Sequence, residues 1–204
     1  MLDVEPVLVP VQIDELRPTQ MTIGYREVER KRREWRQIAE SEGARYLGRH
    51  MIPVVCGPKK HLWVIDNHHL ARALHEEGVE EVLVRVVADL SKLQHRLFTT
   101  FMDNKNWLHP FDDQGHRREL KHLPRHVAKL ADDPYRSLAG ELRRAGGYAK
   151  DQTPYSEFLW ADFLRRHIKR DKVEKHFEEA VAQALEIAHK PKAAYLPGWA
   201  GPHY

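Results

Sequence analysis

A polar cluster separates an apolar run from a helix-like segment in the stretch WVIDNHHLARALHEEG, residues 63–78. The run Leu62–Ile65 is apolar and β-rich, which predicts a buried strand. Helical spacing begins at Leu70 and Gly78 is a natural stop, so the polar residues stand at the N-terminus of a helix. Free N–H groups and the helix dipole attract anions such as phosphate there. The candidate phosphate-binding residues are Asp66, Asn67, His68 and His69. An ordinary capped helix with two surface histidines is the alternative.

The secondary-structure elements expected around this turn differ between the two halves of the chain. Up to about residue 90, short apolar runs alternate with helices, and the expected strands are Val7–Val11, Met51–Cys56, Leu62–Ile65 and Val82–Val87. The expected helices are Tyr25–Glu42 ending at Gly43, Ser91–Met102, a short one near Arg117, Tyr135–Arg144, Ser156–Ile168 and Asp171–His189. We therefore expect an α+β protein, with a small mixed β-sheet domain at residues 1–90 and a helical region at 91–204 packed on it.

Bulk composition limits the function classes. The chain of 204 residues is 42% hydrophobic and 31% charged, as in soluble globular proteins. Its net charge of +3 indicates little by itself, but basic and acidic residues nearly balance in both halves of the chain, and neither half is the strongly basic body expected of a dedicated DNA binder. No apolar stretch approaches the roughly 18 residues that a membrane span needs, and MLDVEPVLVP lacks the features of a secretory signal. Cys56 is the single cysteine, so we expect a cytoplasmic protein without an internal disulfide. No haem, flavin or structural zinc is expected, since the histidines at 109–126 lack zinc-ligand spacing.

The order of elements in the N-terminal half resembles that of a known domain. A strand, a Leu-x-Pro-x-Gln loop at 16–20, a charged helix, an Ile-Pro-Val-Val strand at 52–55 and its hairpin mate precede the polar turn and a valine-rich strand. This order resembles the N-terminal domain shared by ParB partition proteins, sulfiredoxins and archaeal free-serine kinases. Over nearly the whole chain, including residues 132–150 and 154–165, the sequence resembles the bacterial family described as putative ParB-like nucleases.

The resemblance implies roles for the residues of the turn. In this superfamily the matching turn meets the phosphates of a bound nucleotide, so His69 and backbone N–H groups would face phosphate and Asp66 would act as a cap or through a metal ion. Sulfiredoxin chemistry needs a cysteine where this chain has His68, so that activity is not expected. ParB partition proteins carry several arginines here, whereas this chain has Leu70 and then Arg72, a further candidate phosphate ligand. A CTP-gated DNA clamp is not expected, because the C-terminal half shows no helix-turn-helix pattern.

The serine kinases carry Asp-Gly-His-His at the matching turn and a catalytic carboxylate in the loop after their first strand. At that loop position this chain has Gln20, which could bind phosphate but cannot act as a general base. Glu15 and Glu27 are the nearest acids, and with His68 they are the candidate catalytic residues. If neither carboxylate points into the site, the site binds and does not catalyse.

The charged helix after this loop supplies further candidate phosphate ligands. Arg26 and Lys31 would reach the ligand phosphates if the helix begins beside the site, with Arg better suited to a bidentate contact. The alternative is a solvated helix with ion pairs between residues four apart.

Two functional hypotheses remain. The first is a nucleotide-binding enzyme that acts on phosphoryl bonds, either a nuclease or a kinase-like transferase, with Mg²⁺ accompanying the nucleotide. The second is a non-catalytic module in which binding of nucleotide or nucleic acid controls self-association. The expected partners are a nucleotide or another phosphorylated small molecule, weakly bound nucleic acid and, in the second hypothesis, further copies of the chain. No membrane is expected as a partner.

Overall fold

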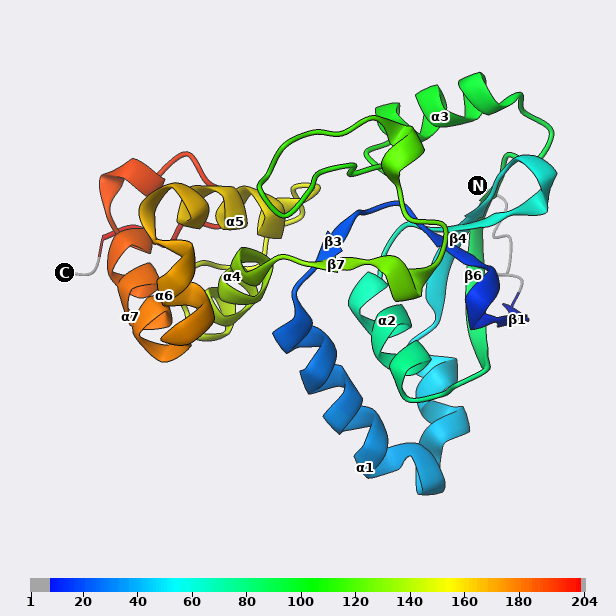
Figure 1. Cartoon of the computed structure of the whole chain (residues 1–204), viewed down its shortest axis with the longest axis horizontal. Coiled ribbons are helices and arrows are strands. Elements are labelled where there is room, and N and C mark those ends of the chain that lie inside the picture. Colours follow the sequence, from blue (N-terminus) through cyan, green and yellow to red (C-terminus); the bar gives the residue numbers. More distant parts are fainter. Residues whose placement is uncertain (1–7, 203–204) are drawn as a thin grey trace. The chain divides into compact units, whose positions relative to one another are not determined.

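The computed structural model describes residues 8–202, which form two compact units (Figure 1). Within that range, the first unit comprises residues 8–23 and 28–131, and the second comprises residues 24–27 and 132–202. The sequence pattern changes near residue 90 from alternating strands and helices to helices alone, but residues 91–131 pack within the first unit. Val7, expected to begin the first strand, lies outside the described residues.

A five-stranded mixed sheet forms the frame of the first unit, in the order β1-β6-β4-β5-β2. Its strands are β1 (Leu8–Gln12), β2 (Leu16–Pro18), β4 (Ile52–Cys56), β5 (Leu62–Val64) and β6 (Glu81–Asp89). The pairs β1–β6 and β4–β5 are antiparallel, and the pairs β2–β5 and β4–β6 are parallel. A second, two-stranded sheet pairs β3 (Thr22–Ile23) with β7 (Ala131–Asp132). The expected α+β class is confirmed.

The sheet is covered on both faces, as the apolar runs of its central strands require. Val54 of β4 packs in one cluster with Leu70 and Leu74 of α2 (His68–Glu76). The next residue, Val55, packs in a separate cluster with Phe98 of α3 (His95–Asn104). Because successive side chains of a strand point to opposite faces, the two helices lie against opposite faces of the sheet.

Helix α1 (Tyr25–Arg49) is longer than expected. The sequence placed its end at Gly43, but the helix continues through this residue for more than a turn. Gly43 is buried, and an added Cβ would lie 3.3 Å from the Trp35 ring. Glycine therefore serves there as a site of close packing between two turns and does not end the helix. By contrast, Gly78 has φ +73° just after α2 and acts as the expected stop.

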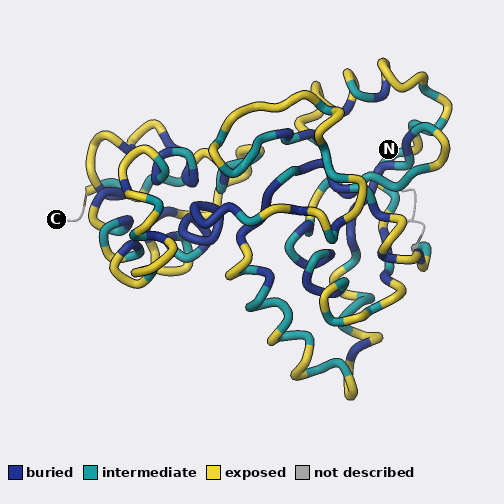
Figure 2. The backbone as a smooth tube through the Cα atoms, in the orientation of Figure 1, coloured by how far each residue is buried: buried dark blue, intermediate teal, exposed yellow. Residues whose placement is uncertain are grey.

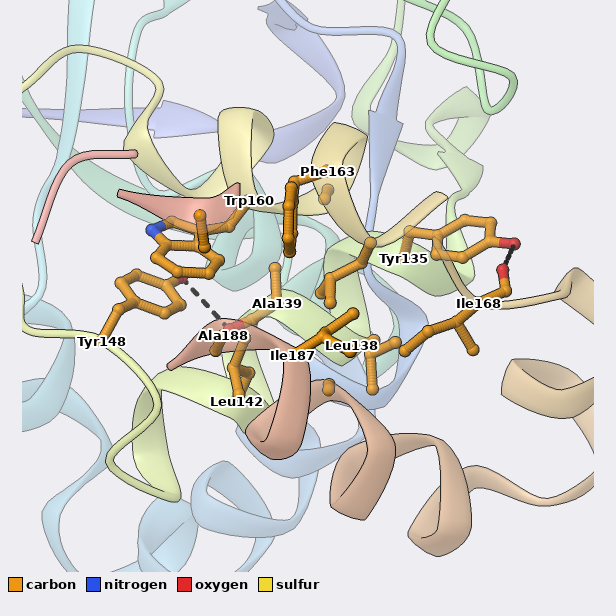
Figure 3. Packing of buried hydrophobic residues seen from close by; sticks show 14 of the residues in the cluster. Tyr135, Leu138, Ala139, Leu142, Tyr148, Trp160, Phe163, Ile168, Ile187 and Ala188 are labelled. Carbon is orange, nitrogen blue, oxygen red and sulfur yellow. Dashed lines mark hydrogen bonds between the residues drawn. The ribbon is translucent and has the colours of Figure 1, made fainter. Parts of the chain in front are cut away.

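The second unit is a helical bundle built around α4 (Pro134–Arg144), which is buried over most of its length (Figure 2). Its other helices are α5 (Ser156–His167), α6 (Arg170–Lys175) and α7 (Phe177–Ala188). Asp133 caps α4 by accepting the Tyr135 N–H at 3.0 Å, which confirms the expected start. Trp160 is fully buried and stacks on Tyr148, whose hydroxyl donates to the Ala139 carbonyl (Figure 3).

Two further expectations about elements are corrected. Residues 16–18, expected in a loop, form the edge strand β2, where Pro18 is tolerated because an edge strand leaves one side of its backbone unpaired. The expected helix Asp171–His189 is broken at His176, whose φ of −134° is not helical. Leu159, next to the fully buried Trp160 in α5, is 42% exposed.

Four short 3₁₀ segments lie in the first unit and one in the second. They are η1 (Ile13–Glu15), η2 (Pro58–Lys60), η3 (Leu120–His122), η4 (Val127–Lys129) and η5 (Pro191–Ala193).

Candidate functional site

The turn between β5 and α2 has the strand-to-helix form expected from its sequence. Asn67 stands at the N-cap position of α2 in a left-handed conformation, with φ 62°. Its side-chain amide donates to the Met51 carbonyl at 3.2 Å, and the Asp66 carboxylate accepts the Asn67 N–H at 2.7 Å. The Asn67 side chain makes no capping hydrogen bond to the first turn of α2, so Asn67 does not have the expected capping role. Asn is one of the few non-glycine residues that adopt this conformation readily.

His68 fastens the turn to the loop that follows β2. Its side chain is only 2% exposed, and its Nε2 accepts the Thr19 N–H at 3.2 Å. The Thr19 hydroxyl lies 3.3 Å from the same nitrogen and donates to the Val64 carbonyl at 2.6 Å. Accepting at Nε2 places the ring proton of neutral His68 on Nδ1. We call these three contacts the Thr19–His68 clasp.

The clasp brings together two of the segments in which the sequence predicted site residues. Because β2 and β5 are parallel, their carboxyl ends lie at the same edge of the sheet, with Thr19 after one and Asp66 after the other. Gln20 is 9% exposed and forms a parallel backbone bridge with His109. Asp66 is exposed and His69 is half-buried. Gln20 and the residues of the turn are therefore neighbours in the first unit.

His109 is a member of this neighbourhood that sequence reasoning missed. Its N–H donates to the Thr19 carbonyl at 2.9 Å, and its ring stacks on Phe111 at 4.3 Å between centroids. From the sequence it was considered only among the histidines at 109–126, which lack zinc-ligand spacing. Nothing local in the sequence could have indicated the contact, because about ninety residues separate the two segments.

Arg72 lies in the same helix but is occupied by protein groups. One guanidinium nitrogen donates to the carbonyls of Ala128 at 2.8 Å and Leu130 at 2.9 Å, while Nε donates to the Glu76 carboxylate at 2.6 Å. Arg72 thereby holds the segment around η4 against α2. A phosphate at the turn would have to compete with these contacts.

The two candidate acids belong to different units. Glu15 ends η1 before β2, at the amino end of that strand, whereas the turn follows the carboxyl ends of β2 and β5. Glu27 belongs to the second unit, where its carboxylate accepts from Arg144 at 2.7 Å and is thereby engaged in an ion pair. Within the first unit, the exposed carboxylate at the turn itself is that of Asp66.

The two cationic candidates on α1 also fall in different units. Arg26 belongs to the second unit, and its guanidinium carbon lies 3.8 Å from the centre of the Phe177 ring. This is a cation–π contact. Lys31 belongs to the first unit and is half-buried on α1.

Cys56 ends β4, as expected of a strand residue beside the hairpin. Burial raises the pKa of its thiol, and the charge of Asp89 raises it further. A raised thiol pKa reduces the thiolate fraction at neutral pH, which opposes nucleophilic chemistry.

Residues 8–202 contain neither a cluster of metal-ligating side chains nor a helix suited to cross a membrane. No three His, Cys, Asp or Glu side chains in this range are grouped as metal ligands. Within the same range, none of the helices combines the length and the apolar character needed to cross a membrane.

The fold is that of ParB-like proteins. The family model described as "Putative ParB-like nuclease" matches residues 9–166, and the chain belongs to this family. A solved relative is "protein Atu1540 from Agrobacterium tumefaciens", whose crystal structure is similar at a TM-score of 0.91 and 51% sequence identity. The match covers 98% of this chain and 100% of that one. No curated protein matches the chain.

Proposed function

We propose that the chain binds a phosphate-bearing ligand, of which a nucleotide is the preferred class, at the mouth of α2. The observation that carries the proposal is the Thr19–His68 clasp, which holds the Thr19–Gln20 loop beside a helix N-terminus whose N-cap residue, Asn67, makes no side-chain capping hydrogen bond. N–H groups of a first helical turn bind anions, and an anion would serve as the missing cap.

In this proposal His68 has a positioning role and His69 a ligand-binding role. His68 is buried and positions the loop, so it does not reach the ligand. His69 is half-buried beside the exposed Asp66 and supplies the donor to phosphate. Gln20 belongs to the neighbouring loop, and its side-chain amide would donate a hydrogen bond to the same ligand. Mg²⁺ bridging Asp66 to the phosphates is part of the proposal, because Mg²⁺ is commonly held by one or two carboxylates together with substrate phosphates.

A thermal-shift screen tests the proposal. ATP, ADP and CTP are each added to the whole chain with and without Mg²⁺, and a ligand at a hundred times its Kd stabilises by about 2.7 kcal/mol. The wild-type protein should be stabilised by at least one nucleotide, and the His69→Ala variant should be stabilised less. His116→Ala is the matched control, because its side chain is 75% exposed and remote in sequence from the turn. No shift with any of the nucleotides overturns the proposal.

A phosphoryl-bond enzyme at the same turn is the second candidate. The family description names a nuclease, and Asp66 offers an exposed carboxylate at the turn. Incubation of the protein with Mg²⁺ and single-stranded DNA, or with ATP, should then release product, and Asp66→Asn should abolish the release. Nucleotide binding without turnover would instead identify a binding module.

Duplex DNA is expected to bind weakly, with a Kd on the order of micromolar to submillimolar at physiological salt. Acidic residues nearly balance basic residues over the chain, with 30 against 33, so there is little net attraction to phosphates. An anisotropy titration with duplexes of two unrelated sequences measures this. Sequence-selective nanomolar binding would contradict it.

A further inference from the structure

A cationic hollow of about 590 Å³ opens in the first unit at the amino ends of β2 and β5. Its basic lining residues are Arg17, Lys59, Lys60, His61, Arg125 and His126. Glu15 and Asp14 also line it, and Asp14 already accepts an ion-pair contact from His75 at 3.2 Å. The α2 turn follows the carboxyl ends of the same strands, so the cationic hollow is a separate place in the fold.

The Lys and Arg side chains of the cationic hollow form no close ion pairs with the described residues, although Asp14 and Glu15 line the same hollow. Among residues 8–202, Arg17, Lys59, Lys60 and Arg125 have no carboxylate within ion-pair distance. Burial lowers the pKa of Arg17, and the nearby charge of Arg125 lowers it further. Repulsion between neighbouring positive charges lowers the free energy of unfolding. An anion bound between these charges would reduce the repulsion.

The hairpin tip presents its lysines through an unusual backbone. Lys59 and Lys60 both have left-handed conformations, with φ of 61° and 59°. Such conformations are uncommon for residues other than glycine and gather at functional sites. The tip is closed by the Gly57 N–H, which donates to the His61 carbonyl at 2.8 Å. This hydrogen bond constrains the backbone of the hairpin tip, from which both lysines line the hollow.

The pKa of His61 is also affected by the positive charges of the cationic hollow. Burial lowers the pKa of its imidazole, and the charges of Arg17 and Lys59 lower it further. A lowered histidine pKa keeps the ring neutral at pH 7, where it can still donate one hydrogen bond. A bound anion would raise this pKa again.

A smaller hollow of about 250 Å³ adjoins the cationic one, because Arg17 and Arg125 line both. Its walls are mostly apolar and aromatic and include Trp63, Phe98 and Leu108. The Trp63 and Phe98 rings lie 5.5 Å apart between centroids, and the Arg17 guanidinium carbon lies 5.7 Å from the Trp63 centroid. Phe98 is only 1% exposed and supports Trp63 from the core, so the half-buried Trp63 ring is the aromatic surface that this hollow offers to a base. We call this smaller cavity the aromatic hollow.

We propose that the two hollows together bind one nucleotide unit, with its phosphate in the cationic hollow and its base in the aromatic hollow. Arg17 and Arg125 stand where phosphate and base join, and a planar guanidinium can both pair with phosphate and stack on a ring. The unit can come from a free mononucleotide or from a single strand of nucleic acid. In either case the site lies apart from the α2 turn, so it does not depend on the function proposed there.

Fluorescence anisotropy of a labelled oligothymidylate tests the proposal in the His69→Ala background, where the α2 turn is weakened. The site variant is Lys60→Gln with Arg125→Gln, and the matched control is Arg33→Gln with Arg49→Gln. All four residues are exposed, and both pairs remove two positive charges from the first unit. Because the Gln side chains are also exposed, neither variant should lose its fold.

The site variant should bind the oligonucleotide about tenfold or more weakly, whereas the control should stay within about twofold of its parent. The slope of log K against log salt should fall by about 0.7 for each phosphate contact removed. Competition by unlabelled dTMP identifies a single nucleotide unit, and competition only by longer oligonucleotides identifies the strand as the source. Equal binding by site and control variants overturns the proposal, as does competition by inorganic phosphate that matches dTMP, which would mean an adventitious anion only.

Discussion

Replacing His68 with Ala tests the Thr19–His68 clasp, the contact on which the candidate site depends. The His68 side chain is 2% exposed, so the substitution leaves a cavity and removes the acceptor of the buried Thr19 N–H. A buried donor without a partner costs about 1–3 kcal/mol, and large-to-small substitutions in a core cost about 2–5 kcal/mol. Since the two costs overlap, we expect the free energy of unfolding of the first unit to fall by about 3–5 kcal/mol.

Urea denaturation followed by Trp fluorescence and by circular dichroism measures this loss. His69→Ala is the matched control, because the neighbouring His69 is half-buried and its replacement should cost about 1 kcal/mol or less. His68→Gln keeps an acceptor in reach of the Thr19 N–H and should recover part of the loss. Equal costs for His68→Ala and His69→Ala would refute the clasp as the element that holds the loop.

Two further predictions concern charges outside the clasp. Asp89→Asn should speed the alkylation of Cys56 at neutral pH, because the Asp89 charge raises the thiol pKa, and a rate unchanged from wild type would contradict this. Glu77 accepts two hydrogen bonds from the Arg36 guanidinium, at 2.6 and 2.7 Å. Because hydrogen bonds to charged groups are worth more than neutral ones, Glu77→Gln should lower the free energy of unfolding of the first unit by about 1–2 kcal/mol. Those hydrogen bonds lower the Glu77 pKa, so the contribution is present above the usual pKa of 4.5 and is lost as pH falls through the lower, folded-state pKa. Urea titrations at pH 7 and pH 3 check the difference, and an equal cost at both would be inconsistent with it.

Local sequence patterns predicted most of the elements but not their lateral partners. The apolar run 52–56 forms the central strand β4, and Asp133 before Pro134 starts α4 as expected. Strand β2 was missed because three residues carry no periodicity and their pairing with β5 is made by a segment far away in sequence. The break at His176 was missed because no proline or glycine marks it.

The candidate site was predicted in position but not in detail. The strand-to-helix pattern located the turn, since it depends on neighbouring residues alone. The sequence could not show which histidine is buried, because that depends on the approach of Thr19, which lies 49 residues away. Nor could it show that Glu27, named as one of the acids nearest to Gln20 in sequence, forms an ion pair with Arg144, which lies 117 residues away.

The central claim, a phosphate-bearing ligand at the mouth of α2, is tested most directly by amide chemical shifts. ADP and CTP are each titrated with Mg²⁺ into isotopically labelled protein, and the backbone amides of residues 67–71 are followed together with those of Thr19 and Gln20. The account predicts that one nucleotide produces its largest saturable shifts at these amides and that His69→Ala reduces the affinity. Saturable shifts confined to residues 59–63 and 125, with none at the α2 turn, would contradict the claim.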